Sequence, residues 1–210
     1  MLAIRLYQQS DEAAVRRICL LTGNNGGDAT DLYPDEDLLS DIFAIPYTVL
    51  DPELCFVAVD GDTGHVVGYI VGTADSPRYV QRFQEEWLPR VRDRHEEPPA
   101  ELDWGKGNQA AMAWILHHPS ADPRVVADYP AHLHIDLLPE GQGRGGGRAL
   151  MTQYLAALRK RGVDGVHLYV GLANTGARAF YAKLGFKPLA LPGDEDQAVG
   201  LLVRSTAMDD

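Results

Sequence analysis

The stretch that most constrains the fold lies around residue 140, where a strand pattern, a glycine-dense turn and a helical pattern follow one another. Residues 131–138 are an apolar-alternating run, five glycines occur between Gly141 and Gly147, and apolar side chains between Leu150 and Leu158 then recur at helical spacing. Glycines let the backbone approach a ligand and adopt positive φ, so that successive N–H groups at a helix start can surround an anion. The sequence therefore predicts a pyrophosphate-binding turn, with a flexible surface loop as the simpler alternative.

Two familiar phosphate loops do not account for these residues. A Walker loop ends in Gly-Lys-Ser/Thr, whereas Arg148 and Ala149 follow Gly147 here, so that loop is excluded. A dinucleotide fingerprint can be aligned only as Gly141-x-Gly143, and no acidic residue ends a second parallel strand about 20 residues further on. The turn is therefore of another kind.

Residues 142–147, Gln-Gly-Arg-Gly-Gly-Gly, resemble the acyl-coenzyme A loop of the GCN5-related N-acetyltransferase (GNAT) superfamily, whose pattern is Gln/Arg-x-x-Gly-x-Gly/Ala. Residues 174–186 resemble the late Asn-x-x-Ala-x-x-Phe-Tyr-x-x-x-Gly-Phe helix and turn of the same superfamily. The resemblance implies an α/β (α+β) fold with a mixed central sheet of about seven strands flanked by helices. It also implies acetyl-CoA as co-substrate and direct transfer of its acetyl group to a primary amine in a ternary complex.

Composition limits the function and the location of the protein. A chain of 210 residues is long enough to form one domain, which we expect over residues 1–210, and a net charge of −11 disfavours a nucleic-acid partner. Cys19 and Cys55 have apolar neighbours, so buried free thiols are favoured over a disulfide, and no metal-ligand spacing occurs. Without a signal stretch or an apolar run of roughly 18 residues, we expect a cytoplasmic protein with no membrane partner. A monomer and a homodimer both remain open.

The periodicity along the chain predicts alternating strands and helices. We expect a strand over 3–7, a helix from an N-cap at Ser10 or Asp11 to Gly23, a short helix after Pro34, a hairpin of strands 54–59 and 66–73, strands near 168–170 and 199–203, and a helix over 174–184. Between the third and fourth strands, at about 76–130, two further helical patterns predict an insertion. Its Trp87, Trp104 and Trp114 either form a core of their own, which we favour, or line the acceptor side.

The insertion and its surroundings resemble a more particular domain. Residues 46–47, 53–57, 68–75, 87–89 and 129–136 are similar to the C-terminal acetyltransferase-like domain of eukaryotic O-GlcNAcase. The coenzyme loop of that domain is degenerate, whereas residues 142–147 here match the superfamily pattern. The resemblance thus implies a stand-alone relative, of bacterial type, that binds coenzyme.

The GNAT resemblance assigns roles to residues around the loop. The expected cofactor-binding residues are Leu137, Leu138, Gln142, Gly143, Arg144, Gly145, Gly146, Gly147, Arg148 and Asn174. Leu137 and Leu138 would offer backbone groups to the pantetheine arm, and Asn174 would bind the arm or cap the helix that follows. Tyr181 would be the general acid that protonates the leaving thiolate, or would pack between Phe180 and Phe186.

For the general base, Asp136 is the first choice, and His134 lies on the same face of the strand. Asp136 is alternatively a ligand that only orients the substrate, and His134 is alternatively a structural histidine. Asp75 and, in the loop after the first helix, Tyr33 are candidate acceptor contacts. The acceptor would be a small-molecule, aminosugar or peptide amine. The rival interpretation is a non-catalytic module that binds coenzyme A or another protein.

Overall fold

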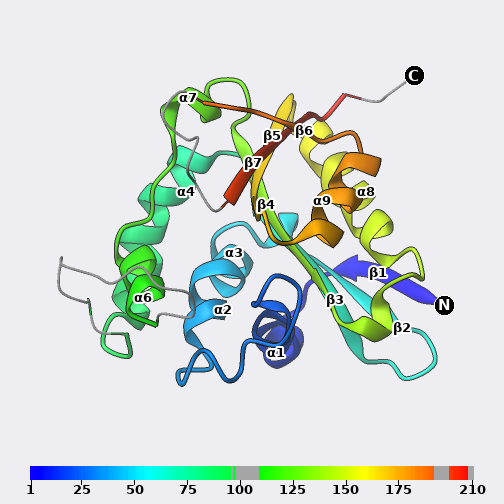
Figure 1. The fold of residues 1–210 in the computed structure, drawn as a ribbon, viewed down its shortest axis with the longest axis horizontal. Coiled ribbons are helices and arrows are strands. Elements are labelled where there is room, and N and C mark those ends of the chain that lie inside the picture. Colours follow the sequence, from blue (N-terminus) through cyan, green and yellow to red (C-terminus); the bar gives the residue numbers. More distant parts are fainter. Residues whose placement is uncertain (96, 98–108, 192–198, 208–210) are drawn as a thin grey trace.

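A computed structural model describes residues 1–95, 97, 109–191 and 199–207. Seven strands form one mixed sheet in the order β1-β2-β3-β4-β5-β7-β6 (Figure 1). The strands are β1 (Leu2–Leu6), β2 (Phe56–Asp60), β3 (Val66–Thr73), β4 (Ala131–Leu137), β5 (Gly165–Gly171), β6 (Lys187–Pro188) and β7 (Val199–Ser205). Neighbouring strands are antiparallel except for β4 and β5, which are parallel. This confirms the expected mixed sheet of about seven strands.

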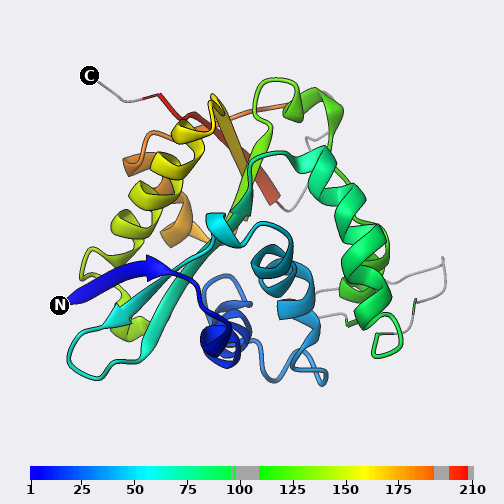
Figure 2. The ribbon, with the colours of Figure 1, turned by 180° about the vertical axis from the view of Figure 1, so that it is seen from behind.

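Helices cover both faces of the sheet (Figures 1 and 2). On one face lie α1 (Glu12–Thr22), α2 (Leu38–Phe43) and α3 (Ile45–Leu50), and on the other lie α8 (Gly146–Lys160) and α9 (Thr175–Lys183). Short 3-10 turns at Gln9–Asp11, Pro52–Leu54 and Pro139–Gly141 precede α1, β2 and the glycine turn. Successive side chains of a strand face opposite sides, so that Val57 of β2 joins the core under α1 whereas Ala58 joins the core under α8.

The start of α1 differs in one detail from the sequence-based expectation. Asp11 is the N-cap residue, but its carboxylate does not cap an amide of α1. It accepts instead from the N–H of Gln8 at 2.9 Å and pairs with Arg5 of β1 at 2.6 Å. The aspartate therefore fixes the turn between β1 and α1, because the 3-10 turn places the Gln8 amide within its reach.

The insertion between β3 and β4 is helical, as expected. It contains α4 (Ser76–Arg82), a π-helical turn (Phe83–Trp87), α5 (Leu88–Val91), α6 (Gln109–His117) and α7 (Pro123–Val126). The π turn has a local cause: Pro89 lacks an N–H and its ring crowds the carbonyl four residues earlier, and the N–H of Leu88 bonds Phe83 five residues back.

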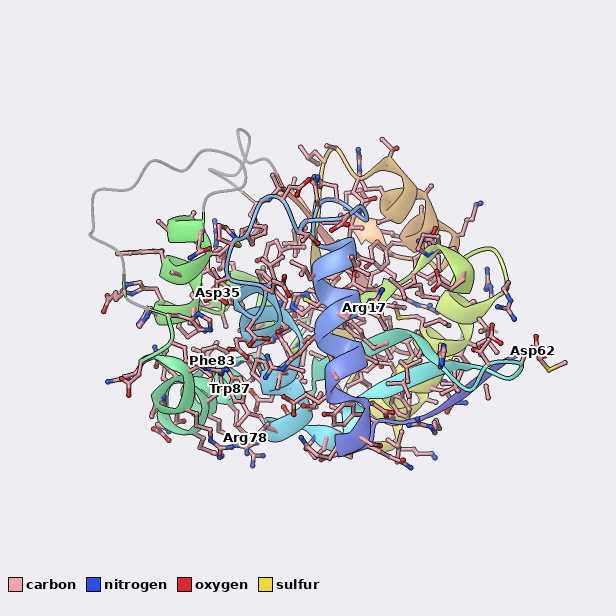
Figure 3. The ribbon with its side chains drawn as sticks, turned by 90° about the horizontal axis from the view of Figure 1, so that it is seen from below. Arg17, Asp35, Asp62, Arg78, Phe83 and Trp87 are labelled. Atoms are coloured by element: carbon pink, nitrogen blue, oxygen red, sulfur yellow. The ribbon has the colours of Figure 1, made fainter. Side chains whose placement is uncertain are left out.

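The insertion packs against the α1–α3 side of the molecule. Figure 3 shows Phe83 and Trp87 on the side of the insertion that faces α2 and α3, and both belong to the core under α1. The Trp87 indole N–H donates to the backbone oxygen of Asp41 at 2.8 Å. Trp87 is therefore a core residue, but of the shared core rather than a separate one. Trp114 stacks near His118 at 3.8 Å between ring centres, and Trp104 lies outside the described residues.

A buried ion-pair network joins the insertion to the two helices beneath it. The Asp41 side chain of α2 has no exposed surface and pairs with Arg16 of α1 at 2.8 Å, with Arg94 at 2.9 Å and with His95 at 2.8 Å. One carboxylate thus connects three segments that are distant in sequence.

Two further expectations concern the cysteines and membrane-spanning segments. Cys19 and Cys55 are buried and free, as expected, and burial raises the pKa of the Cys19 thiol to about 12, so this thiol stays neutral. Across the described part of the chain, no helix has the length and apolar character needed to cross a membrane.

Candidate active site

The parallel strands β4 and β5 separate soon after they begin. Their registered pairs are Ala131 with Val166 and His132 with His167, whereas β4 remains paired with β3 as far as Leu137. The N–H of Leu138 bonds the oxygen of Val67, so even-numbered residues of β4 direct their backbone groups toward β3. The backbone groups of Ile135 and Leu137 therefore face the gap.

A cavity of about 720 Å³ occupies this gap. Its walls come from five segments: the end of α1 with the turn after it, the end of β4, the glycine turn with the start of α8, the loop after β5, and α9. The lining residues are Thr22, Asn25, Gly26, Ile135, Asp136, Leu137, Gly141, Gln142, Gly143, Gly145, Gly146, Gly147, Arg148, Ala173, Asn174, Thr175, Gly176, Ala177, Phe180, Tyr181, Lys183 and Leu184. Most of the expected cofactor-binding residues are thus brought together in one cavity.

The glycines of the turn are required for two different reasons. Gly143 and Gly145 have φ of 68° and 82°, a region that other residues rarely adopt. Gly146 and Gly147 are instead close-packed, since a Cβ on them would lie 2.7 Å from Leu2 and 3.0 Å from Phe180. The first described helical bond runs from Ala149 to Gly145, so the N–H groups of residues 146–148 have no partner within α8. Amides at a helix start that lack a partner within the helix can bind an anion, as the sequence predicts for this turn.

The two arginines of the turn, both expected to bind the cofactor, have different surroundings. Arg148 lines the cavity and is placed to contact an anion there. Arg144 does not line it: its guanidinium donates to the Asp60 carboxylate and to the backbone oxygen of Glu140. The Arg144 hydrogen bond holds the pKa of Asp60 at about 2. Arg144 therefore ties the turn to the end of β2, and cofactor binding by its side chain stays a prediction.

Three other residues that are expected to bind the cofactor have defined contacts in the structure. Leu138 does not line the cavity, because its N–H bonds Val67 and its oxygen accepts from Gly141. The Gln142 side chain donates to the oxygen of Leu137 at 2.8 Å, which holds the turn against the end of β4. The Asn174 side chain caps α9 by accepting from the Ala177 N–H at 3.0 Å and also lines the cavity, so both of its expected roles are compatible.

Asp136 lies at the cavity wall and is held from behind. Its Oδ2 accepts a 2.6 Å hydrogen bond from the hydroxyl of Tyr69 on β3. Burial raises the pKa of Asp136, and the hydrogen bond from Tyr69, together with the nearby Thr22 hydroxyl, partly opposes that rise. A carboxylate with a raised pKa is a stronger base near neutral pH than an exposed aspartate. Its position and its pKa are both compatible with proton removal.

Tyr181 faces the same cavity from α9. Its ring packs 5.4 Å from Phe180 and 5.5 Å from Phe186 between centres, so the alternative packing role is also met. Burial, and then the nearby Asp136, raise the pKa of Tyr181. The phenol therefore stays protonated and can donate a hydrogen bond into the cavity.

Three expected substrate contacts lie outside this cavity. His134 packs against Phe43 at 5.3 Å and Tyr47 at 5.5 Å between ring centres, and burial lowers its pKa to about 4. Asp75 caps α4 by accepting from the Arg78 N–H at 3.0 Å, at the end of β3 away from the gap. Tyr33 is buried in the core under α1. The described contacts of these side chains are structural ones.

The loop after α1 reaches the cavity, but through residues other than the expected Tyr33. Asn25 and Gly26 line the cavity, whereas Tyr33 does not. They form a tight turn closed by a bridge between Asn24 and Gly27, with positive φ of 51° at Asn25 and 91° at Gly26. The Asn-Asn-Gly-Gly run is a recognisable turn signal. What the sequence could not reveal is that this turn packs beside Gly171 and Asn174 across the gap.

Amides at a helix start, a gap between parallel strands, a carboxylate and a phenol are the features that the sequence predicts for an acyltransferase cleft, and they lie together here. Residues 24–186 match the acetyltransferase (GNAT) family, so the chain belongs to that family. This membership confirms the expected enzyme class, the acyl-CoA-dependent N-acetyltransferases.

Solved structures agree with this assignment. The crystal structure of SsHAT is 46% identical, covers 99% of both chains and superposes with a TM-score of 0.87. A GNAT superfamily phosphinothricin acetyltransferase from Sinorhizobium meliloti, solved in complex with AcCoA, is 16% identical over 97% of this chain and 88% of that one, with a TM-score of 0.57. At that identity the second likeness shows the fold alone.

Curated relatives match a shorter stretch. The mycothiol acetyltransferase of Beutenbergia cavernae is 42% identical over 89 residues, which is 42% of this chain and 28% of that protein. The mycothiol acetyltransferase of Nocardia farcinica is 41% identical over 75 residues, or 36% of this chain and 23% of that protein. The matches thus span about a quarter of the length of these relatives.

Within the described residues, no group of three or more potential metal ligands is found.

Proposed function

We propose that the protein transfers the acetyl group of acetyl-CoA to a primary amine by direct attack in a ternary complex. The observation that carries this proposal is that Asp136, Tyr181 and the glycine turn line one cavity in the gap between β4 and β5. The turn supplies backbone amides for an anion, and the two side chains supply a base and a hydrogen-bond donor. The gap supplies the backbone groups of Ile135 and the N–H of Leu137, whose oxygen accepts from Gln142. We treat residues 1–210 as a single domain with its insertion at about 76–130.

The cavity fits the coenzyme by its chemistry. The amides of residues 146–148 and the side chain of Arg148 would hold the pyrophosphate, and Leu137 and Asn174 would contact the pantetheine arm. Acetyl-CoA supplies an acetyl group activated as a thioester. An N–H at the end of β4, such as that of Leu137, would stabilise the negative charge that develops on the thioester oxygen.

The residues then have distinct tasks. Asp136 takes a proton from the acceptor ammonium, which leaves a neutral amine able to attack the carbonyl carbon. Tyr181 donates a hydrogen bond to the sulfur as negative charge develops there. One C–N bond forms and one C–S bond breaks, and the products are the amide, the thiol and one proton released to water.

The acceptor is proposed only as a class. The name shared by several relatives places amines related to mycothiol among the small-molecule acceptors to be tested, together with aminosugars and peptides. The relatives described above are mycothiol acetyltransferases by name, not O-GlcNAcases. The non-catalytic role that the predicted resemblance to the acetyltransferase-like domain of O-GlcNAcase raises is tested by the experiment described next. A cytoplasmic location is compatible with the use of acetyl-CoA as donor. The cavity is compatible with a monomer and with a homodimer.

The test is calorimetric titration of the protein with acetyl-CoA, with Gly145→Asp as the matched variant. Aspartate at Gly145 would place a side chain at a φ of 82° and a negative charge beside the phosphates. We expect micromolar binding by the natural sequence and none by the variant, followed by thiol release when an accepted amine is added.

Two results would contradict the proposal. Equal affinity in the folded Gly145→Asp variant would remove the turn as the donor site. Donor binding without transfer to any amine, shorter or longer acyl donors included, would favour the non-catalytic module.

A further inference from the structure

Tyr69 lies directly behind Asp136 and is not among the residues that line the cavity. It has no exposed surface, and it is the registered partner of Asp136 across the β3–β4 pair. Side chains of directly opposite residues share one face of an antiparallel pair, so their contact follows from the register. The contact is a hydrogen bond of 2.6 Å from the phenol to Oδ2 of Asp136.

This bond occupies one of the two carboxylate oxygens and therefore fixes the rotation of the group. We propose that Tyr69 is a positioning residue, which holds the Asp136 carboxylate so that Oδ1 is presented to the acceptor nitrogen. The inference rests on the proposed function, in which Asp136 is the base. Tyr69 itself touches neither substrate in this arrangement.

Among the groups around Asp136, Tyr69 is the main hydrogen-bond donor to its carboxylate. From α1, the Thr22 hydroxyl lies near Asp136, but its single proton bonds the oxygen of Ile18 at 2.7 Å, and the Cys19 thiol is neutral. From α9, Tyr181 and Lys183 face the same cavity. On β4, burial lowers the pKa of His134 to about 4, so this imidazole is neutral near pH 7.

The hydrogen bond has a predictable electrostatic effect. Burial raises the pKa of Asp136, and the Tyr69 phenol opposes that rise because it donates to the charged form. Removal of the hydroxyl therefore raises the pKa of Asp136 further. A hydrogen bond to a charged group accounts for roughly a tenfold change in proton affinity, which is about one pKa unit.

The experiment is an NMR titration of the full chain labelled with 13C at the aspartate carboxyl carbons, comparing the natural sequence with Tyr69→Phe. We expect the midpoint of Asp136, assigned by its loss in Asp136→Asn, to rise by about one unit. With an accepted amine, the acid limb of kcat/KM should move upward by the same amount, while the KM for acetyl-CoA stays unchanged.

Tyr154→Phe is the matched control. Tyr154 is also fully buried, but it lies on α8 at the opposite face of the sheet, and its hydroxyl bonds the backbone oxygens of Thr73 and His132. This variant loses a comparable buried hydroxyl without touching Asp136. Its Asp136 midpoint should equal that of the natural sequence.

The outcomes separate this inference from the proposed function. An unchanged Asp136 midpoint in folded Tyr69→Phe would overturn the positioning role. If that variant does not fold, replacement of Tyr69 by 3-fluorotyrosine, a stronger donor of the same shape, should lower the midpoint instead, and no shift would again overturn the role. A shifted midpoint in a protein that acetylates no amine would support the Tyr69–Asp136 coupling and contradict the proposed function.

Discussion

At the scale of single residues, burial acts in the same direction on two side chains with different consequences. It raises the pKa of both Asp136 and Tyr181. For a carboxylate this increases basicity, whereas for a phenol it strengthens the neutral form. A free phenol already has a higher pKa than a thiol, about 10 against about 8.5. We therefore expect Tyr181 to stabilise the leaving sulfur by hydrogen bonding, because full transfer of the phenol proton to the thiolate would be unfavourable.

Tyr181→Phe tests this role. The ring and its contacts with Phe180 and Phe186 are retained, so the fold and the affinity for acetyl-CoA should not change. Because only the donor to sulfur is lost, kcat should fall by about 100-fold. Steady-state kinetics with a calorimetric donor affinity would measure both quantities, and an unchanged kcat would leave Tyr181 with packing alone.

At the scale of elements, the turn before α8 uses two neighbouring arginines in different ways. Arg148 lines the cavity, whereas Arg144 pairs with Asp60 at the end of β2. We expect the first to contribute charge to an anion site and the second to hold the turn in place. The resemblance to the superfamily predicts cofactor binding by both.

The pair Arg148→Gln and Arg144→Gln separates the two roles. Arg148→Gln should weaken acetyl-CoA binding by about tenfold and reduce its dependence on salt, since a charge-assisted contact is lost. Arg144→Gln should leave the salt dependence intact and instead increase amide hydrogen exchange in the turn. Calorimetry at two ionic strengths and exchange mass spectrometry would measure these effects. The reverse pattern would reassign Arg144 to the phosphates.

The difference between the arginines illustrates what the sequence can predict. Residues 131–160 could be read as strand, turn and helix because alternation, glycine and helical spacing are local signals. The sequence signals for the insertion at 76–130 and for the cap at Asn174 are local in the same sense. The partner of Arg144 is 84 residues away, and Tyr69 pairs with Asp136 only through the β3–β4 register. Such contacts depend on which strands become neighbours, and that information is not local.

At the scale of the whole molecule, the Asp41 carboxylate joins α1, α2 and the insertion. It is fully buried, and its partners are Arg16, Arg94 and His95. Without it, Arg16 would keep Glu12 and a longer contact with Asp37, and Arg94 would keep only its contact with Asp37. Breaking a buried ion pair by removing one partner is strongly destabilising. The network therefore fixes the insertion against the α1–α3 layer.

Asp41→Ala should destabilise the fold by about 3 kcal/mol, or about 10 °C in Tm for a chain of this size. Asp37→Ala is the control, because Asp37 reaches the same arginines at 3.4 Å and 3.8 Å but is half-exposed, and it should change stability by less than about 1 kcal/mol. Thermal unfolding of both variants is the measurement. Equal losses would mean that the network is held by surface charge rather than by the buried carboxylate.

The early separation of β4 from β5 also divides the sheet into two groups of strands that are synthesised one after the other. Within the described residues, strands β1 to β4 complete their mutual pairing by Leu137, and β5, β7 and β6 form a second antiparallel group joined to the first by two registered pairs. Because synthesis runs from the N-terminus, the strands of the first group are made before those of the second. The second group must pair with an edge that is only partly matched to it, and α8, which packs against β1 to β4, is made between the two groups. The gap between β4 and β5 therefore lies where the strands that are synthesised last join those that are synthesised first.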